Sequence, residues 1–174
     1  KPPKKGMSVP LPVAARDGSI LRELMGRPCA IFSFLDGTSS RHPNREKCKA
    51  LGQRLAELHL NATGISGNRQ NALGPASWQA LLDSVGQRAN EIVPEIENMA
   101  QDRLNSILGA WPQNLPRGII HADLFPNNVL FIRDNLTGVI DFYFACEDIL
   151  AYDIATCLNS WCFDADGSFN LTKS

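Results

Sequence analysis

Polar residues at fixed spacing between short apolar runs constrain this chain more than any other feature. His121, Asp123 and Asn128 form the pattern H-x-D-x-x-x-x-N, which begins directly after the apolar run Gly118–Ile120. A second apolar run, Val129–Ile132, follows Asn128 without a gap. Short apolar runs bounded by turn formers are typical of strands, so we predict that one loop between two strands holds all three polar side chains.

A fourth polar residue, Asp141, follows the next apolar run, Gly138–Ile140. The segment Arg133–Thr137 contains turn formers, so the runs on either side of it are predicted to pair as a β-hairpin. Pairing brings the end of one strand beside the start of the other. We therefore predict that Asp141 lies within reach of Asn128.

Two carboxylates and an amide that converge in this way provide what phosphoryl transfer requires. We predict that Asp123 orients the attacking hydroxyl and accepts its proton, and that Asn128 and Asp141 bind Mg²⁺ through hard oxygen atoms. His121 is predicted to fix the loop backbone through hydrogen bonds. Taken singly, each Asp or Asn also suits an ordinary turn, but the combined spacing favours a catalytic site.

The rest of the chain predicts an α+β protein that is mainly helical. The apolar run Cys29–Leu35 is predicted as a buried strand that ends at Asp36. Apolar residues recur every three to four positions in four further segments, which predicts helices. These helices are Asn44–Leu60, one capped by Ser77, Pro94–Trp111 and Ile149–Phe163, with a loop predicted over Asn61–Pro75.

Composition excludes several classes of partner. The net charge is −1, from 17 basic and 18 acidic residues, so we expect no nucleic-acid or membrane partner. The five cysteines include no C-x-x-C pair, which predicts free thiols in a reducing compartment. No apolar run reaches membrane-spanning length, and we expect a cytoplasmic protein.

The segment that contains these polar residues resembles the catalytic loop and metal-binding segment of the aminoglycoside phosphotransferase and choline kinase superfamily. Members of this superfamily have a protein-kinase-like fold. The resemblance implies that Asp123 is the catalytic base and that His121 supports the loop. It also implies that Asn128 and Asp141 are the Mg²⁺ ligands.

One residue outside this segment, Asp153, leaves two alternatives open. Asp153 resembles the family's later helix aspartate, which steadies the catalytic loop, but the helix dipole alone also favours an aspartate in a first turn. His59 is predicted to pack within its helix and not to bind a ligand.

Within the superfamily, the chain is similar to the bacterial homoserine kinases. The similar segments are His121–Phe131, Ile140–Cys146, Asp17–Gly18, Leu21–Leu24, Gly26–Pro28, Phe34–Gly37, Leu51–Gly52, Leu55–Ala56 and Leu58–His59. The resemblance implies an enzyme that uses ATP and Mg²⁺ to phosphorylate the hydroxyl of L-homoserine, a step of threonine biosynthesis. It implies a hinge at Phe34, Leu35 and Asp36, whose backbone groups receive the nucleobase. Residues 1–37 are then the remainder of an N-lobe sheet with the hinge, and residues 38–174 are a helical C-lobe with the catalytic loop and metal site.

The chain departs from this family at both ends. No Gly-rich phosphate loop, strand lysine or partner glutamate precedes Cys29, and the family continues with further helices where this chain stops. We therefore expect a portion of a longer polypeptide. Three alternatives stay open: transfer to another small alcohol such as an aminoglycoside, choline or hydroxylysine, a non-catalytic pseudokinase module, and a metal-dependent hydrolase. The sequence does not identify the residues that bind the acceptor's carboxylate.

Overall fold

The computed structural model combines three two-stranded antiparallel sheets with four α-helices in the residues it describes, 9–65, 67 and 69–174. Residues 1–8, in the predicted N-lobe segment, and residues 66 and 68, in the predicted loop, lie outside the described residues. The elements are β1 (Arg22–Leu24), β2 (Arg27–Cys29), α1 (Arg45–Asn61), α2 (Pro75–Val85), α3 (Ile96–Ala110), β3 (Arg117–Ile120), β4 (Val129–Ile132), β5 (Asn135–Val139), β6 (Cys146–Ile149) and α4 (Leu150–Trp161). Short 3₁₀ helices lie at Gly86–Glu91, Pro126–Asn128 and Phe142–Phe144.

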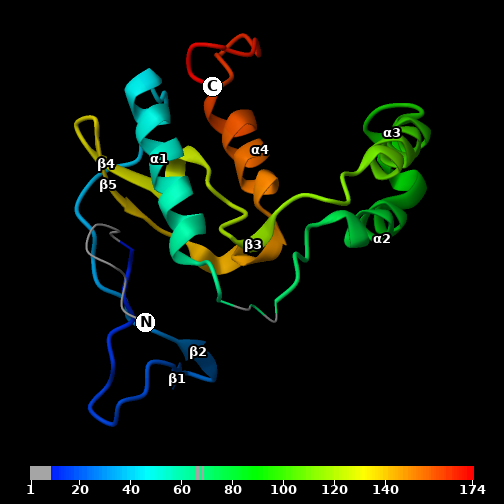
Figure 1. The fold of residues 1–174 in the computed structure, drawn as a ribbon. Coiled ribbons are helices and arrows are strands. Elements are labelled where there is room, and N and C mark those ends of the chain that lie inside the picture. Colours follow the sequence, from blue (N-terminus) through cyan, green and yellow to red (C-terminus); the bar gives the residue numbers. More distant parts are fainter. Residues whose placement is uncertain (1–8, 66, 68) are drawn as a thin grey trace.

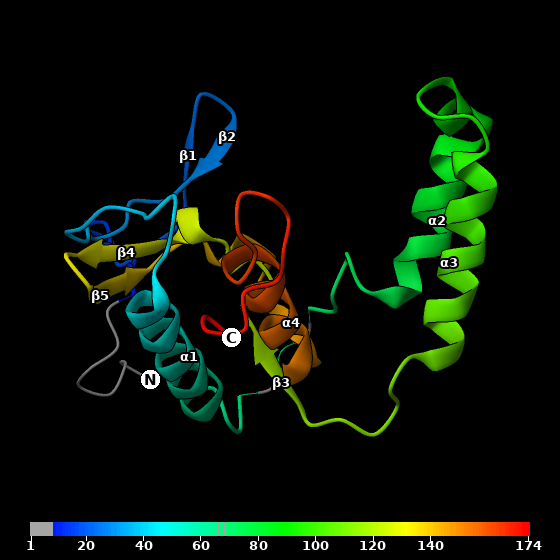
Figure 2. The same ribbon diagram turned by 90° about the horizontal axis from the view of Figure 1, so that it is seen from above.

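The main body is built from α1 and α4 packed on two of the sheets. Strand β3 pairs with β6 and strand β4 pairs with β5, and the two helices lie side by side next to them (Figure 1). The α2–α3 pair stands apart from this body, as both views show (Figure 2). The β1–β2 hairpin projects from another side of the body.

The hydrophobic core lies between the two helices and the β4–β5 sheet. Leu51 and Leu55 of α1 are four residues apart and therefore face the same side, where they meet Trp161 of α4. Phe131 of β4 packs against Trp161 with ring centroids 6.2 Å apart. This core fixes the β4–β5 hairpin, and with it the adjoining segments that carry Asn128 and Asp141.

The four predicted helices are present, with shifted ends. Asn44, the first residue of one predicted helix, is the N-cap of α1 and accepts a hydrogen bond from the Lys47 N–H at 3.0 Å. Ser77 is not a cap, because α2 begins at Pro75 after the cap residue Gly74. Pro94 lies outside α3, because Glu95 has a left-handed backbone (φ 64°) that interrupts helical geometry.

The predicted buried strand Cys29–Leu35 is wrong in its bounds and its burial. Strand β2 ends at Cys29, and Phe32 makes only an isolated bridge with Pro12. The Leu11 N–H binds the Ser33 hydroxyl oxygen at 2.9 Å instead of a backbone oxygen, so the ladder does not continue on that side. Phe34 is 87% exposed, and its apolar character does not place it in the described core.

The second half of the chain contains a strand that the sequence did not predict. Strand β6 pairs with β3 in the register Ile120↔Cys146 to Arg117↔Ile149, so Ile149 ends a strand and does not begin a helix. The predicted β4–β5 hairpin is confirmed, although β5 begins earlier, at Asn135, after a tight turn in which Arg133 has φ 57°. None of the helices among the described residues is long and apolar enough to cross a membrane.

Candidate active site

The loop between β3 and β4 places the predicted catalytic residues at one end of the β3–β6 sheet. Two backbone hydrogen bonds fold the loop tightly: Phe125 N–H to Asp123 O at 2.8 Å and Asn128 N–H to Phe125 O at 2.9 Å. Ala122 has a left-handed backbone (φ 65°), which is costly for a residue with a side chain. The loop is therefore held in one conformation by its surroundings.

Asn128 joins the two sides of the site. Its Nδ2 donates to the Asp123 backbone oxygen and to Asp123 Oδ2, both at 2.8 Å. Its backbone oxygen accepts the Ile140 N–H at 2.9 Å, and Ile140 immediately precedes Asp141. The structure thus brings Asp123, Asn128 and Asp141 together across the β4–β5 hairpin; their chemical roles stay predictions.

Asp141 sits at a strained turn and is exposed to solvent. Its backbone is left-handed (φ 62°), and its Oδ1 accepts a weak hydrogen bond from the Tyr143 N–H at 3.4 Å. This turn directs the chain away from β5 immediately after the sheet ends. The carboxylate therefore has room to bind a further group.

His121 connects the catalytic loop to the Asp141 turn from a fully buried position. Its Nε2 lies 3.0 Å from the Ile140 backbone oxygen, and its Nδ1 lies 3.3 Å from the Asp123 backbone nitrogen. Because a carbonyl oxygen only accepts, Nε2 carries the proton and Nδ1 accepts the Asp123 N–H. The ring packs on Phe142 with centroids 4.6 Å apart. Burial lowers the pKa of His121, against smaller opposing effects of the Ile140 carbonyl and nearby carboxylates, so the ring is neutral.

Asp153, on α4, binds the backbone of the catalytic loop through its side chain. Its buried carboxylate accepts the His121 N–H at 2.9 Å and the Ala122 N–H at 2.7 Å. Of the two alternatives left open for this residue, these contacts favour support of the catalytic loop. His59 was predicted only to pack, but its Nε2 lies 2.9 Å from Asp153 Oδ2, so it binds the same carboxylate. The Trp161 indole N–H adds a hydrogen bond to the Leu124 oxygen at 2.7 Å.

The residues predicted to bind the nucleotide lie against the β4–β5 hairpin. Leu35 packs against Gly138, and the Asp36 backbone oxygen accepts the Thr137 hydroxyl at 2.6 Å. Phe34 is exposed beside them. Small-ligand pockets commonly measure about 300–1,000 Å³. A cavity of about 670 Å³ near this region is lined by Val9, Pro10, Phe32, Asp141, Phe142 and Tyr143.

Arg69 is a residue of the site that the sequence analysis missed. One guanidinium nitrogen, Nη1, donates to the Tyr143 backbone oxygen, and the guanidinium carbon lies 5.5 Å from the centre of the Tyr143 ring. The Arg69 backbone oxygen accepts the Glu147 N–H at 2.9 Å. No spacing rule marks this residue, because its partners are a backbone carbonyl and a ring 74 positions away.

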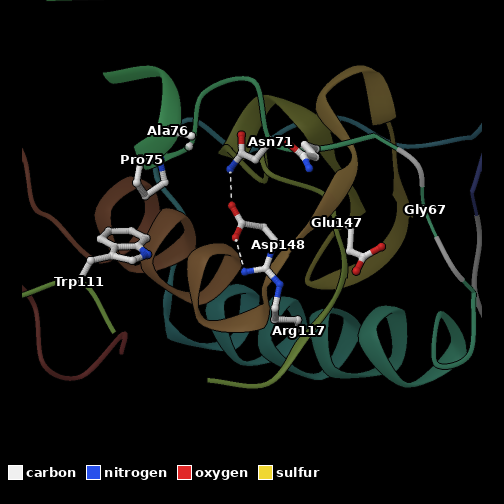
Figure 3. A pocket seen from close by; sticks show the side chains of 10 residues that line it. Gly67, Asn71, Pro75, Ala76, Trp111, Arg117, Glu147 and Asp148 are labelled. Atoms are coloured by element: carbon white, nitrogen blue, oxygen red, sulfur yellow. Dashed lines mark hydrogen bonds and ion pairs between the residues drawn. The ribbon is translucent and has the colours of Figure 1, made fainter. Parts of the chain in front are cut away.

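A second cavity, of about 570 Å³, lies at the base of the α2–α3 pair, and its lining includes Gln70 and Asn71, the two residues that follow Arg69. Figure 3 shows Asp148 at its centre, between Asn71 and Arg117. Asn71 Nδ2 donates to Asp148 Oδ2 at 2.8 Å, and Arg117 Nη1 forms an ion pair with Asp148 Oδ1 at 3.4 Å. These contacts fix the segment that carries Arg69 to the β3–β6 sheet.

The donor atoms of the site fit Mg²⁺. The amide nitrogen of Asn128 faces Asp123, which leaves its oxygen available, and the Asp141 carboxylate is exposed. No group of three or more His, Cys, Asp or Glu side chains with the arrangement of a metal site occurs in the described part of the chain. Two oxygen donors are nevertheless sufficient for Mg²⁺, which commonly completes its coordination with phosphates and water.

Sequence comparisons identify relatives along nearly the whole chain. The homoserine kinase of Allorhizobium ampelinum is 51% identical over 169 residues, which cover 97% of this chain and 53% of the relative. The homoserine kinase of Azorhizobium caulinodans is 50% identical over 168 residues, which cover 97% of this chain and 52% of the relative. The chain spans about half the length of the curated relatives it matches, which agrees with the expectation of a partial chain.

Solved structures with the same fold are phosphotransferases. An aminoglycoside-3′-phosphotransferase of type VIII superposes with a TM-score of 0.68 at 18% identity, covering 97% of this chain and 64% of that chain. An amicoumacin kinase, solved with AMP-PNP and Ca²⁺, gives a TM-score of 0.67 at 18% identity, covering 89% of this chain and 48% of that chain. The predicted protein-kinase-like α+β fold is confirmed. Residues 4–173 match the model of the phosphotransferase enzyme family, and the chain belongs to this family.

Proposed function

We propose that the protein transfers the γ-phosphoryl group of ATP to the side-chain hydroxyl of L-homoserine, giving O-phosphohomoserine. Relatives named homoserine kinase share about half of their aligned residues with this chain, over 97% of its length. The observation that carries the proposal is the position of Asn128, which contacts the Asp123 carboxylate and adjoins the strand that leads to Asp141.

The contacts support a separate proposed task for each polar residue. Asn128 holds Asp123 Oδ2, so the other carboxylate oxygen of Asp123 accepts the proton of the acceptor hydroxyl. The hydroxyl oxygen attacks the γ-phosphorus while the bond from that phosphorus to the bridging oxygen of ADP breaks. Neutral His121 keeps the Asp123 backbone and the Asp141 turn in register. The Asn128 and Asp141 oxygens would hold Mg²⁺, which, when bound, neutralises phosphate charge.

The nucleotide site is proposed at the segment that precedes α1. Since the Asp36 backbone oxygen already accepts the Thr137 hydroxyl, we assign the nucleobase to the backbone groups of Phe34 and Leu35. The mostly apolar cavity beside Phe32 and Asp141 then adjoins the nucleobase, and the triphosphate extends from it toward Asp141 and Asn128. In this arrangement residues 1–37 contribute to the nucleotide lobe and residues 38–174 to the acceptor lobe.

An assay of the full-length protein tests the proposal. With MgCl₂, ATP and L-homoserine we expect ADP release and one phosphomonoester signal in ³¹P NMR, with equal amounts of both products. ADP release with choline, hydroxylysine or an aminoglycoside but not with L-homoserine rejects the acceptor. Phosphate release without any acceptor indicates a hydrolase, and absence of Mg²⁺-dependent ATP binding in calorimetry indicates a non-catalytic module.

A further inference from the structure

We propose that Arg69 binds the carboxylate of an amino-acid acceptor and thereby selects this class of substrate. The inference rests on the proposed phosphotransferase function, and it names a residue that binds the non-reacting end of the acceptor.

Arg69 is fixed beside the turn that follows Asp141. Its backbone oxygen accepts the Glu147 N–H at 2.9 Å, and the next residue, Gln70, forms a parallel bridge with Glu147. The side chain extends from this anchored backbone to the Tyr143 carbonyl, two residues after Asp141. The guanidinium is therefore held next to the proposed metal side of the active site.

The charge of an amino-acid acceptor requires a cation in this region. An acceptor whose hydroxyl reaches Asp123 brings its own carboxylate close to the carboxylates of Asp123 and Asp141, and like charges repel. A guanidinium offsets this repulsion and matches the planar carboxylate with two parallel hydrogen bonds.

Arg69 has the donors to make such a pair. A guanidinium carries five N–H donors, and the Tyr143 carbonyl occupies one nitrogen of Arg69. Among residues 9–65, 67 and 69–174, no Asp or Glu forms an ion pair with Arg69, and its side chain is exposed. The Tyr143 ring lies against the guanidinium at 5.5 Å, which limits its orientation and leaves its edge for a ligand.

A purely structural role for Arg69 makes a different prediction. If Arg69 only holds the Tyr143 carbonyl, its loss moves the Asp141 turn and slows transfer to every acceptor equally. If it binds the carboxylate, its loss slows transfer only to acceptors that carry one. Comparing an acid with its amide separates the two roles.

The experiment uses the full-length protein with L-homoserine and with L-homoserinamide, in which a carboxamide replaces the carboxylate. We expect Arg69→Gln to lower kcat/KM for L-homoserine by about 10- to 100-fold, mainly through KM, because a charge-assisted pair is lost. For the amide we expect a change of less than about 2-fold, since the amide carries no charge for Arg69 to bind. Arg69→Lys keeps the charge without the planar fork and should fall between the two.

Arg103→Gln, an exposed arginine on α3, serves as the control for loss of one positive charge and should behave as the unmodified protein. Equal losses for acid and amide in Arg69→Gln overturn the carboxylate role while leaving the proposed function intact. Absence of transfer to any hydroxy amino acid by the unmodified protein overturns both.

Discussion

Asp153 Oδ2 accepts the backbone N–H of His121 at 2.9 Å, although the two residues are 32 positions apart. The same fully buried carboxylate also receives the Ala122 N–H and lies 2.9 Å from His59 Nε2. One side chain thus fixes the strained start of the catalytic loop.

Asp153→Asn should therefore destabilise the protein. An amide turns one acceptor oxygen into a donor that faces other donors, so we expect a loss of about 3 kcal/mol in the free energy of unfolding. Urea unfolding of the full-length protein measures it. Asp102→Asn, at an exposed position on α3, should change this free energy by less than about 0.5 kcal/mol. Equal stabilities of the two variants would refute the support that we assign to Asp153.

Substitutions of the two carboxylates should affect different quantities, the affinity for ATP in one case and kcat in the other. Asp141→Ala removes a proposed Mg²⁺ ligand, so we expect at least about a 10-fold loss of Mg²⁺-dependent ATP affinity in calorimetry. Asp123→Asn should retain ATP affinity while kcat falls by about 100-fold or more, because the proton acceptor is lost. If Asp123→Asn loses ATP affinity as strongly as Asp141→Ala, the assignment of roles is wrong.

Stability should fall in mild acid because of His121. Burial lowers the pKa of His121 below its ordinary value of 6.5, so the unfolded chain binds a proton more readily than the folded one. The contribution of the neutral ring is complete above about pH 6.5 and is lost as the pH falls from there toward the lower folded pKa. We expect Tm between pH 5 and pH 8 to depend less on pH in His121→Gln than in the unmodified protein. Parallel Tm profiles would contradict this.

Gly37 should not tolerate a side chain. Its φ is 135°, and an added Cβ would lie 2.5 Å from Thr137 Oγ1 and 3.1 Å from the Phe131 backbone oxygen. Gly37→Ala should therefore lower the free energy of unfolding by about 1–3 kcal/mol. Gly109, inside α3, has open space at its Cβ, so Gly109→Ala should raise this free energy by about 0.5–1 kcal/mol. Urea unfolding compares them, and a neutral Gly37→Ala variant would contradict the close contact with the β4–β5 hairpin.

Local patterns predicted the parts of the protein that depend on local physics. Helix α1 follows from apolar spacing and the cap at Asn44, and the hairpin beside Asn128 follows from two apolar runs around a turn. The proximity of Asn128 and Asp141 could be predicted because the hairpin register decides it.

Features that depend on distant partners were not predicted. Strand β6 exists because β3 pairs with it, and four residues that begin with Cys146 show no period of their own. The contact between His59 and Asp153 joins α1 and α4 through two residues that are 94 positions apart. The prediction for Phe34 was also wrong: this apolar residue was predicted to be buried, and it is exposed in this chain.

The hydrogen bond from the Trp161 indole to the Leu124 oxygen makes Trp161 fluorescence a reporter of the catalytic loop. The indole is 1% exposed and is bound to the residue that follows Asp123, so its emission depends on the position of the catalytic loop. The other two tryptophans, Trp78 and Trp111, contact each other at the separate α2–α3 pair. Replacing both with phenylalanine leaves Trp161 as the single tryptophan of this sequence, whose emission wavelength and lifetime follow the loop while nucleotide and acceptor are added.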